Sequence, residues 1–263
     1  MSRTVQPVDT HHLAAHLDEL LAVAATPDYP TAMNGLQVDN RAPIVRVAAA
    51  VDASRRTIQG AIDAGASLLL VHHGLFWSGS QPVTGARYDR LKLLLDNDLA
   101  VYSAHLPLDA HPTLGNNVLL AGALGLDPEG AFGAWKTIHI GVQGASELRT
   151  SELLDRAASF AATHDGRVHA TPFDRDHLTR RWAIVTGGGA GAETLAEARD
   201  GGIDTLIVGE GPHWTAVDAP EQDLVIIYAG HYATETLGVQ ALAAHVEREF
   251  GIPWSWIPAP TGL

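Results

Sequence analysis

The chain has 263 residues, 46% of them hydrophobic, which is enough for one sizeable core or two small ones and excludes a disordered or fibrous protein. The formal net charge of −13, with no Lys/Arg-rich block, disfavours nucleic-acid binding and suits an acidic metal-binding protein. Cysteine is absent, so His and carboxylates are the only strong metal donors. No signal-peptide pattern and no run near the roughly 18 apolar residues of a membrane span occurs, and we therefore expect a soluble, cytoplasmic protein without a membrane partner.

Short β-branched or aliphatic runs alternate with Ala-rich helical patterns along the chain, which indicates an α/β fold with parallel or mixed sheets. In chain order we expect helix 9–25 with an Asp cap, strand 44–51, helix 54–64 with a Ser cap, strand 67–72, helix 87–97, strand 99–104, helix 116–123, strand 137–142, helix 151–163, strands 167–172 and 181–186, helix 192–200, strands 205–208 and 224–229, and helix 233–250. Continuous apolar runs at 68–71 and 225–228 are typical of strands buried on both faces.

The chain resembles itself at two places. Residues 61–77 align without a gap on 198–214, with seven of the seventeen positions identical. Residues 101–109 then align on 227–235, and both segments place a His four residues before an acid. Chance similarity between Ala/Gly-rich connections is the alternative, but two matches in the same order favour a true repeat.

The repeat predicts two similar α/β lobes, each a mixed or parallel sheet flanked by helices, at 1–125 and 126–263. Two such lobes would pack about a pseudo-two-fold axis as one compact unit. Because ligands of α/β sheets bind beyond the carboxyl ends of the strands, we expect the polar clusters at those ends to share a cleft.

A pair of histidines ends the strand predicted at 67–72. Adjacent strand residues point to opposite faces, so His72 and His73 can enter one site only where the chain turns, and Gly74 permits that turn. Each imidazole could bind a different ion of a pair, since neutral imidazole suits Zn²⁺, Fe²⁺ or Ni²⁺. A purely structural pair at a strand end is the alternative.

Two further clusters place a His four residues before an acid. His231 and Glu235 open the last predicted helix, where this spacing stacks two side chains on one face, although a surface pair would show the same spacing. The other cluster runs from His105 to Asp109. Pro107 disfavours a helix interior there, so we expect a loop. Asp109 is the better ligand there, because two ions need anionic donors, whereas His105 could ligate, orient Asp109 or shuttle protons, and we favour the last two roles.

Three other features could serve the same site. Glu210 occupies the position in the second repeat that His73 occupies in the first, and it could be a general base or a partner of a ligand imidazole. The glycine-rich segment 186–191 could form an anion nest or a plain flexible turn. Arg55, Arg56 and Arg87 are candidates for holding phosphates.

Taken together, these clusters make the chain resemble the GTP cyclohydrolase I type 2 homologue family, also described as Nif-three-like dinuclear-metal proteins. The matching stretches cover essentially the whole chain: 34–38, 51–54, 71–77, 105–109 with 115–117, 208–210 and 230–235.

The resemblance implies two divalent metal ions per chain, held by His72, His73, Asp109, His231 and Glu235, with Glu235 bridging. It also implies a toroidal homohexamer whose metal sites face an internal cavity. The regulatory-type insertion of some members is missing here, since only about a hundred residues separate Asn117 from His231.

Two functions fit these residues. The first is a metal-dependent hydrolase of a nucleotide or related ring, in which metal-activated water attacks and Glu210 or His105 moves protons. The second is a non-catalytic protein that holds or delivers metal ions. The sequence leaves open whether the protein is an enzyme and which of Zn²⁺, Fe²⁺, Mn²⁺, Co²⁺ and Ni²⁺ it binds.

Overall fold

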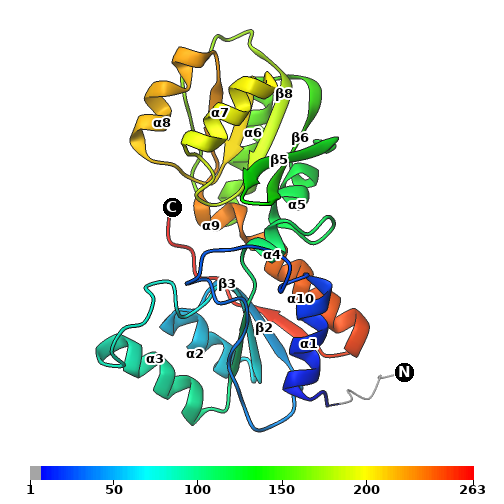
Figure 1. The fold of residues 1–263 in the computed structure, drawn as a ribbon, viewed down its shortest axis with the longest axis vertical. Helices are drawn as coiled ribbons and strands as arrows, with labels where there is room; N and C mark the ends of the chain where they lie inside the picture. Colours follow the sequence, from blue (N-terminus) through cyan, green and yellow to red (C-terminus); the bar gives the residue numbers. More distant parts are fainter. Residues whose placement is uncertain (1–6) are drawn as a thin grey trace. The chain divides into compact units, whose positions relative to one another are not determined.

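The computed structural model describes residues 7–263. The chain divides into two compact units (Figure 1). Unit 1 comprises the residues up to Leu108 together with Gly238–Ala259, and unit 2 comprises Asp109–Leu237 with Pro260–Leu263.

Unit 1 is built on a five-stranded mixed sheet with the order β1-β4-β3-β2-β11, in which only the β1–β4 pair is antiparallel. Its strands are β1 (Gly35–Val38), β2 (Val47–Asp52), β3 (Leu68–His73), β4 (Ala100–Ser103) and β11 (Trp254–Trp256). Its helices are α1 (Thr10–Leu20), α2 (Arg55–Asp63), α3 (Gly85–Asp96) and most of α10 (Thr236–Phe250).

The sheet of unit 1 is covered on both faces. Ala48, Ala50, Leu69 and Val71 pack with buried residues of α2 and α3 on one face. Figure 1 draws α1 and α10 on the other face, and the stacked rings of His16 and His245 join these two helices. This double cover explains why β3 reads as an uninterrupted apolar run.

Local signals at two helix starts agree with the sequence analysis. The Asp9 side chain accepts a hydrogen bond from His12 N at the start of α1. Ser54 and Thr57 form a capping box at the start of α2.

Unit 2 contains a six-stranded mixed sheet with the order β5-β6-β8-β9-β10-β7. Its strands are β5 (Gly130–Trp135), β6 (Ile138–Arg149), β7 (His169–Ala170), β8 (Leu178–Val185), β9 (Thr205–Val208) and β10 (Val225–Tyr228). Its helices are α5 (Asn116–Ala123), α6 (Thr150–Ala162), α7 (Ala192–Gly201), α8 (His213–Asp218), the 3-10 turn η1 (Pro220–Gln222) and α9 (His231–Thr234). The helix α4 (Leu106–Asp109) crosses from unit 1 into unit 2.

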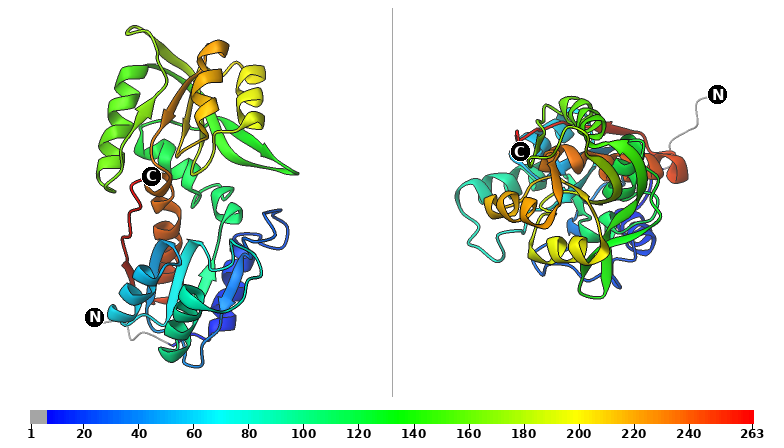
Figure 2. Two further views of the ribbon diagram at one scale, coloured as in Figure 1. Left: turned by 90° about the vertical axis from the view of Figure 1, so that its left-hand side faces the viewer. Right: turned by 90° about the horizontal axis from the view of Figure 1, so that it is seen from above.

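Alternate residues of the central strands of unit 2 pack on opposite faces. Ala183 and Val185 join a core with α7, whereas Trp182 and Ile184 join a core with α5 and α6. Figure 2 shows α6 on the side of the sheet opposite α7 and α8.

The topology confirms the internal repeat and the α/β fold. Unit 1 runs β2-α2-β3-α3-β4 and unit 2 runs β8-α7-β9-α8-β10, with three adjacent parallel strands in each case. A short helix follows the third strand in both units, namely α4 in unit 1 and α9 in unit 2. The two aligned sequence segments therefore occupy equivalent places.

The division of the chain differs from the lobes expected at 1–125 and 126–263. The segment 109–125 belongs to unit 2, where Leu120 and Leu124 of α5 pack with Trp182. The segment 238–259 belongs to unit 1 because β11 pairs with β2. The pairing of β11 is a long-range contact that no local pattern reports.

Several elements depart from the sequence expectations. The strands β1, β5 and β11 were not expected, β6 extends well beyond 142, and β7 is only two residues long. Residues 21–25 lie outside the first helix, which ends at Leu20. No helix among residues 7–263 is long and apolar enough to cross a membrane.

Candidate metal centre

Three histidines of unit 1 converge at the carboxyl ends of adjacent parallel strands. His72 and His73 end β3, and His105 follows β4 by two residues. One nitrogen from each ring can be chosen so that the three atoms lie within 4.8 Å of one another. His72 is fully buried and His105 is 9% exposed, so these rings are held in place largely out of water.

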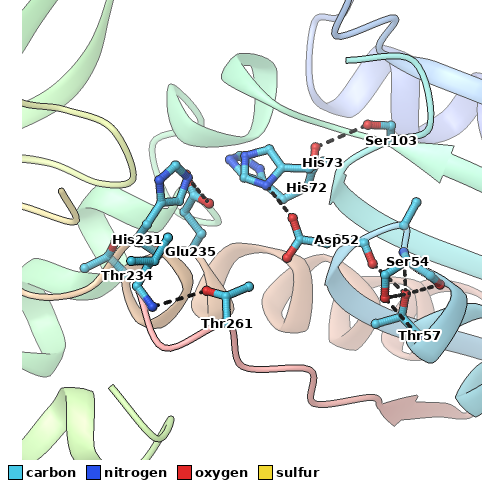
Figure 3. Close-up of polar contacts among 12 residues, drawn as sticks. Asp52, Ser54, Thr57, His72, His73, Ser103, His231, Thr234, Glu235 and Thr261 are labelled. Carbon is cyan, nitrogen blue, oxygen red and sulfur yellow. Dashed lines mark hydrogen bonds and ion pairs between the residues drawn. The ribbon is translucent and has the colours of Figure 1, made fainter. Parts of the chain in front are cut away.

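Each of these histidines directs Nδ1 at an oxygen atom. His72 Nδ1 lies 2.8 Å from the carbonyl oxygen of Ala104, and His73 Nδ1 lies 2.9 Å from Asp52 Oδ1 (Figure 3). His105 Nδ1 lies 2.9 Å from Asp28 Oδ1. Because an oxygen acceptor needs a proton on Nδ1, the neutral rings carry their lone pair on Nε2, as metal-binding histidines do.

The carboxylate that holds His105 is itself fixed. Asn34 Nδ2 donates to Asp28 Oδ2 at 2.8 Å, and Asn34 Oδ1 accepts from His105 N at 2.7 Å. Burial by itself would raise the pKa of Asp28, but the bonds from His105 and Asn34 outweigh it and hold the pKa below its usual value. Asp28 is thus an ionised partner of a buried ring.

Gly74 has a different role from the expected turn. It does not adopt a positive φ, but a Cβ there would collide with the side-chain amide of Gln37. That amide accepts a hydrogen bond from Leu75 N at 2.8 Å and so fixes the chain just after the two histidines. The glycine permits a close approach, which sequence alone does not distinguish from a turn.

In unit 2, His231 and Glu235 come from α9 and the residue that ends it, rather than from one continuous helix. Glu235 has a φ of −105° and separates α9 from α10. His231 Nε2 lies 3.1 Å from Glu235 Oε2, and the two side chains point toward each other in Figure 3. Glu235 is 3% exposed, so its carboxylate is almost wholly withdrawn from water.

Glu210 follows β9 by two residues and holds the same imidazole from its other side, with Oε1 2.9 Å from His231 Nδ1. Burial by itself would lower the pKa of His231, but the carboxylates of Glu235 and Glu210 outweigh it and raise the pKa to about 9. In the metal-free protein His231 is therefore an imidazolium at neutral pH, with a proton on the nitrogen that faces Glu235.

The fifth candidate ligand, Asp109, lies in a helical turn, so the expected loop was wrong. Pro107 is the second residue of α4, where a backbone N–H is not needed for helical bonding. Asp109 is 8% exposed, and its Oδ1 accepts a hydrogen bond from Asn116 Nδ2 at 2.8 Å. Asn117 Nδ2 donates a hydrogen bond to the carbonyl oxygen of Asp109, and Asn117 Oδ1 accepts one from Thr186 N at 2.8 Å.

The glycine-rich segment 186–191 packs against the His231–Glu235 pair. Gly187 has a φ of +62°, and a Cβ on it would collide with Glu235 Oε1. Its N–H donates to Thr234 Oγ1 at 3.0 Å, and its carbonyl oxygen accepts from Glu210 N at 2.8 Å. The segment thus supports the candidate ligands of unit 2 directly.

Unit 1 brings His72, His73 and His105 together, and unit 2 joins His231 to Glu210 and Glu235. Arg55 and Arg56 lie exposed at the start of α2, and Arg87 donates to Gly79 O and lies over the Phe76 ring. Four residues that hold the candidate ligands are given no role by the sequence: Asp28, Asn34, Asp52 and Asn116. Asn34, Asp52 and Asn116 lie in stretches that match the family, so the resemblance was the signal in the sequence that could have pointed to them. Asp28 lies outside these stretches.

The two carboxylates beside His231 lead to a prediction about pH. Glu210→Gln lowers the pKa of His231 in the metal-free protein from about 9 toward its ordinary 6.5, because one of two anions is lost. Since the folded pKa is raised, the proton on His231 stabilises the fold fully below about pH 6.5, and this contribution is lost as the pH rises through 9. NMR titration of the imidazole measures the shift, and the exposed Glu221→Gln is the control. An unchanged pKa in Glu210→Gln would contradict this assignment.

Comparison with known proteins identifies the family of the chain. The family model described as Duf34/NIF3 (NGG1p interacting factor 3) matches residues 8–258. A Deinococcus radiodurans protein named GTP cyclohydrolase 1 type 2 homolog is 44% identical over 253 residues, which cover 95% of this chain and 93% of that protein. A Halobacterium salinarum protein of the same name is 41% identical, covering 97% of this chain and 100% of its own.

Solved structures give the same result. A structure described as protein ybgI, of unknown function, superimposes with a TM-score of 0.87 at 32% identity, covering 97% of this chain and all of that one. Protein TTHA1606 from Thermus thermophilus superimposes with a TM-score of 0.81 at 34% identity and the same coverage. The chain therefore belongs to the Duf34/NIF3 family, whose curated relatives carry the name GTP cyclohydrolase 1 type 2 homolog.

Proposed function

We propose that this protein binds two divalent metal ions through His72, His73, Asp109, His231 and Glu235 and uses them to hydrolyse a nucleotide or a related ring. The observation that carries the proposal is the set of hydrogen bonds from ring Nδ1 to an oxygen in His72, His73 and His231. Such bonds orient Nε2 as a metal donor and are the usual support of ligating histidines.

The proposed ligand set supplies the charge that two divalent ions require. Unit 1 offers His72, His73 and His105. An imidazole is neutral when it binds a metal, so these three donors cannot offset the roughly four positive charges of two divalent ions. The buried carboxylates of Asp109 and Glu235 belong to unit 2 and supply the missing negative charge. His105 has the same kind of support as His72 and His73, so it is a candidate ligand as well as a proton carrier.

Nitrogen and carboxylate donors fit Zn²⁺, Fe²⁺, Mn²⁺, Co²⁺ and Ni²⁺. Ions bound there would supply Lewis acidity, which polarises the bond to be cleaved and makes water more acidic. The chain's own groups would orient the donors, and Glu210, which already accepts a hydrogen bond from His231, is the candidate for holding or moving a proton.

Metal content is the direct test. The protein reloaded with divalent ions and analysed by mass spectrometry of the metals is expected to hold two ions per chain. Glu235→Gln should lower the content of both ions if Glu235 bridges them. Asp52→Ala should weaken binding by about ten- to a hundredfold, because it releases the ring of His73, whereas the exposed Asp63→Ala should not. A protein that cannot be loaded would refute the proposal.

The glycine-rich segment gives a second test with an adjacent control. Gly187→Ala should weaken metal binding and lower stability, because a Cβ there collides with Glu235 and φ is positive. Gly188→Ala should have little effect, since the nearest atom to its Cβ is 4.0 Å away. Metal titration of both variants, checked by circular dichroism, distinguishes the positions. Equal behaviour of the two would contradict the supporting role of Gly187.

Turnover decides between the two candidate functions. The reloaded protein should hydrolyse GTP or a member of a nucleotide panel, and Glu210→Gln should reduce that rate while metal remains bound. Two tightly bound ions without turnover, but with transfer to a metal-free acceptor, would instead favour a metal-holding or delivery protein.

A homohexamer and a cytoplasmic location are further proposals. Sedimentation equilibrium tests the hexamer, whose mass would be six times the 27.8 kDa of the chain.

A further inference from the structure

Unit 2 contains a cavity that the proposed metal ligands do not occupy. It has a volume of about 420 Å³, which lies in the range of small-molecule sites. Arg167 and His169 line it from β7 and the residues before β7, His213 from the start of α8, and Tyr228 from the end of β10. All of these residues belong to unit 2.

The three basic side chains of this cavity have no partner among residues 7–263, whereas Glu210, which also lines it, is paired with His231. Arg167 forms no ion pair or side-chain hydrogen bond there, and neither do the rings of His169 and His213. In a chain with 30 acids and 17 Lys and Arg residues, three unpaired basic groups around one cavity provide a site for an anion.

The donors also indicate which anion fits. They come from two places in the fold, β7 with the residues before it and the start of α8, and an imidazole N–H can donate whether the ring is neutral or charged. A phosphate monoester has three terminal oxygens that can each accept such a bond, whereas a carboxylate has two oxygens in one plane. Arginine is a preferred partner of phosphate because of its fixed array of donors.

The rest of the lining suits a planar apolar body. The Tyr228 hydroxyl is 2.8 Å from Thr215 Oγ1, so the position of its ring is fixed, and Pro212 and Ala216 complete that part of the wall. Aromatic and apolar side chains around a few polar groups are the usual composition of a ligand pocket.

One acidic residue joins this cavity to the candidate ligands. Glu210 lines the cavity, and its Oε1 is also the partner of His231 Nδ1 at 2.9 Å. A molecule in the cavity would therefore lie against a residue that supports a candidate metal ligand.

We propose that this cavity binds a phosphate monoester with a planar ring, its phosphate held by Arg167, His169 and His213 and its ring lying beside Tyr228. The identification of this molecule as a substrate rests on the proposed hydrolase function. The binding itself does not depend on metal.

Phenyl phosphate is the probe, titrated by calorimetry into the full chain, both as purified and with a chelator present. The expected result is binding in both forms that Arg167→Gln weakens about tenfold or more, because a charge-assisted contact is lost. Arg175→Gln, an exposed arginine of the same unit that does not line the cavity, is the matched control and should bind as the unchanged protein does. Arg167 is exposed, so its replacement should not impair folding, and thermal melting checks this.

A second variant tests the ring. Tyr228→Leu should reduce the preference for phenyl phosphate over methyl phosphate. Equal binding by Arg167→Gln and Arg175→Gln would overturn the proposal, as would benzoate that binds as tightly as phenyl phosphate. Binding of phenyl phosphate by a protein that cannot be loaded with metal would refute the metal site alone. A fully loaded protein that binds no phenyl phosphate in the presence of chelator would refute this inference alone.

Discussion

Hydrogen bonds from histidine Nδ1 atoms to oxygen are the interaction on which the candidate site depends. One imidazole donates to an oxygen of each of four residues: Ala104, Asp52, Asp28 and Glu210. Each bond fixes both the orientation of an imidazole and the nitrogen that carries the lone pair. Asp52, Ala104 and Glu210 lie at or just after the ends of parallel strands, whereas Asp28 lies in the segment between α1 and β1. The cost of keeping such rings out of water is offset by the same bonds.

The internal repeat gives each unit the same frame but different chemistry at its edge. In unit 1 the residue that ends the aligned strand is His73, and in unit 2 the equivalent residue is Glu210. Unit 1 accordingly presents neutral nitrogen donors, two of them held by carboxylates and His72 by a backbone carbonyl, whereas unit 2 presents carboxylates around one imidazole. The proposed pair of divalent ions would need donors of both kinds, namely nitrogen ligands and enough negative charge.

Electrostatics in unit 2 link the proposed metal site to the neighbouring cavity. Without metal, the proton on His231 neutralises part of the charge of Glu210 and Glu235, which is why the pKa of His231 is raised. A divalent ion would compete with that proton, so metal binding and protonation are coupled. Glu210 belongs to both places, since it supports His231 and lines the cavity beside Arg167.

The sequence by itself determined the α/β class, the repeat and the candidate ligands, because strand burial, the His–x–x–x–acid spacing and the family motifs are local patterns. Only the tertiary structure decided which oxygens hold the rings: Asp28 is 77 residues from His105, and Asp52 is 21 residues from His73. The same is true of β11, whose pairing with β2 assigns the C-terminal helix to unit 1. Hydrogen bonds and strand pairs between distant segments depend on the folded chain, and no periodicity in the sequence encodes them.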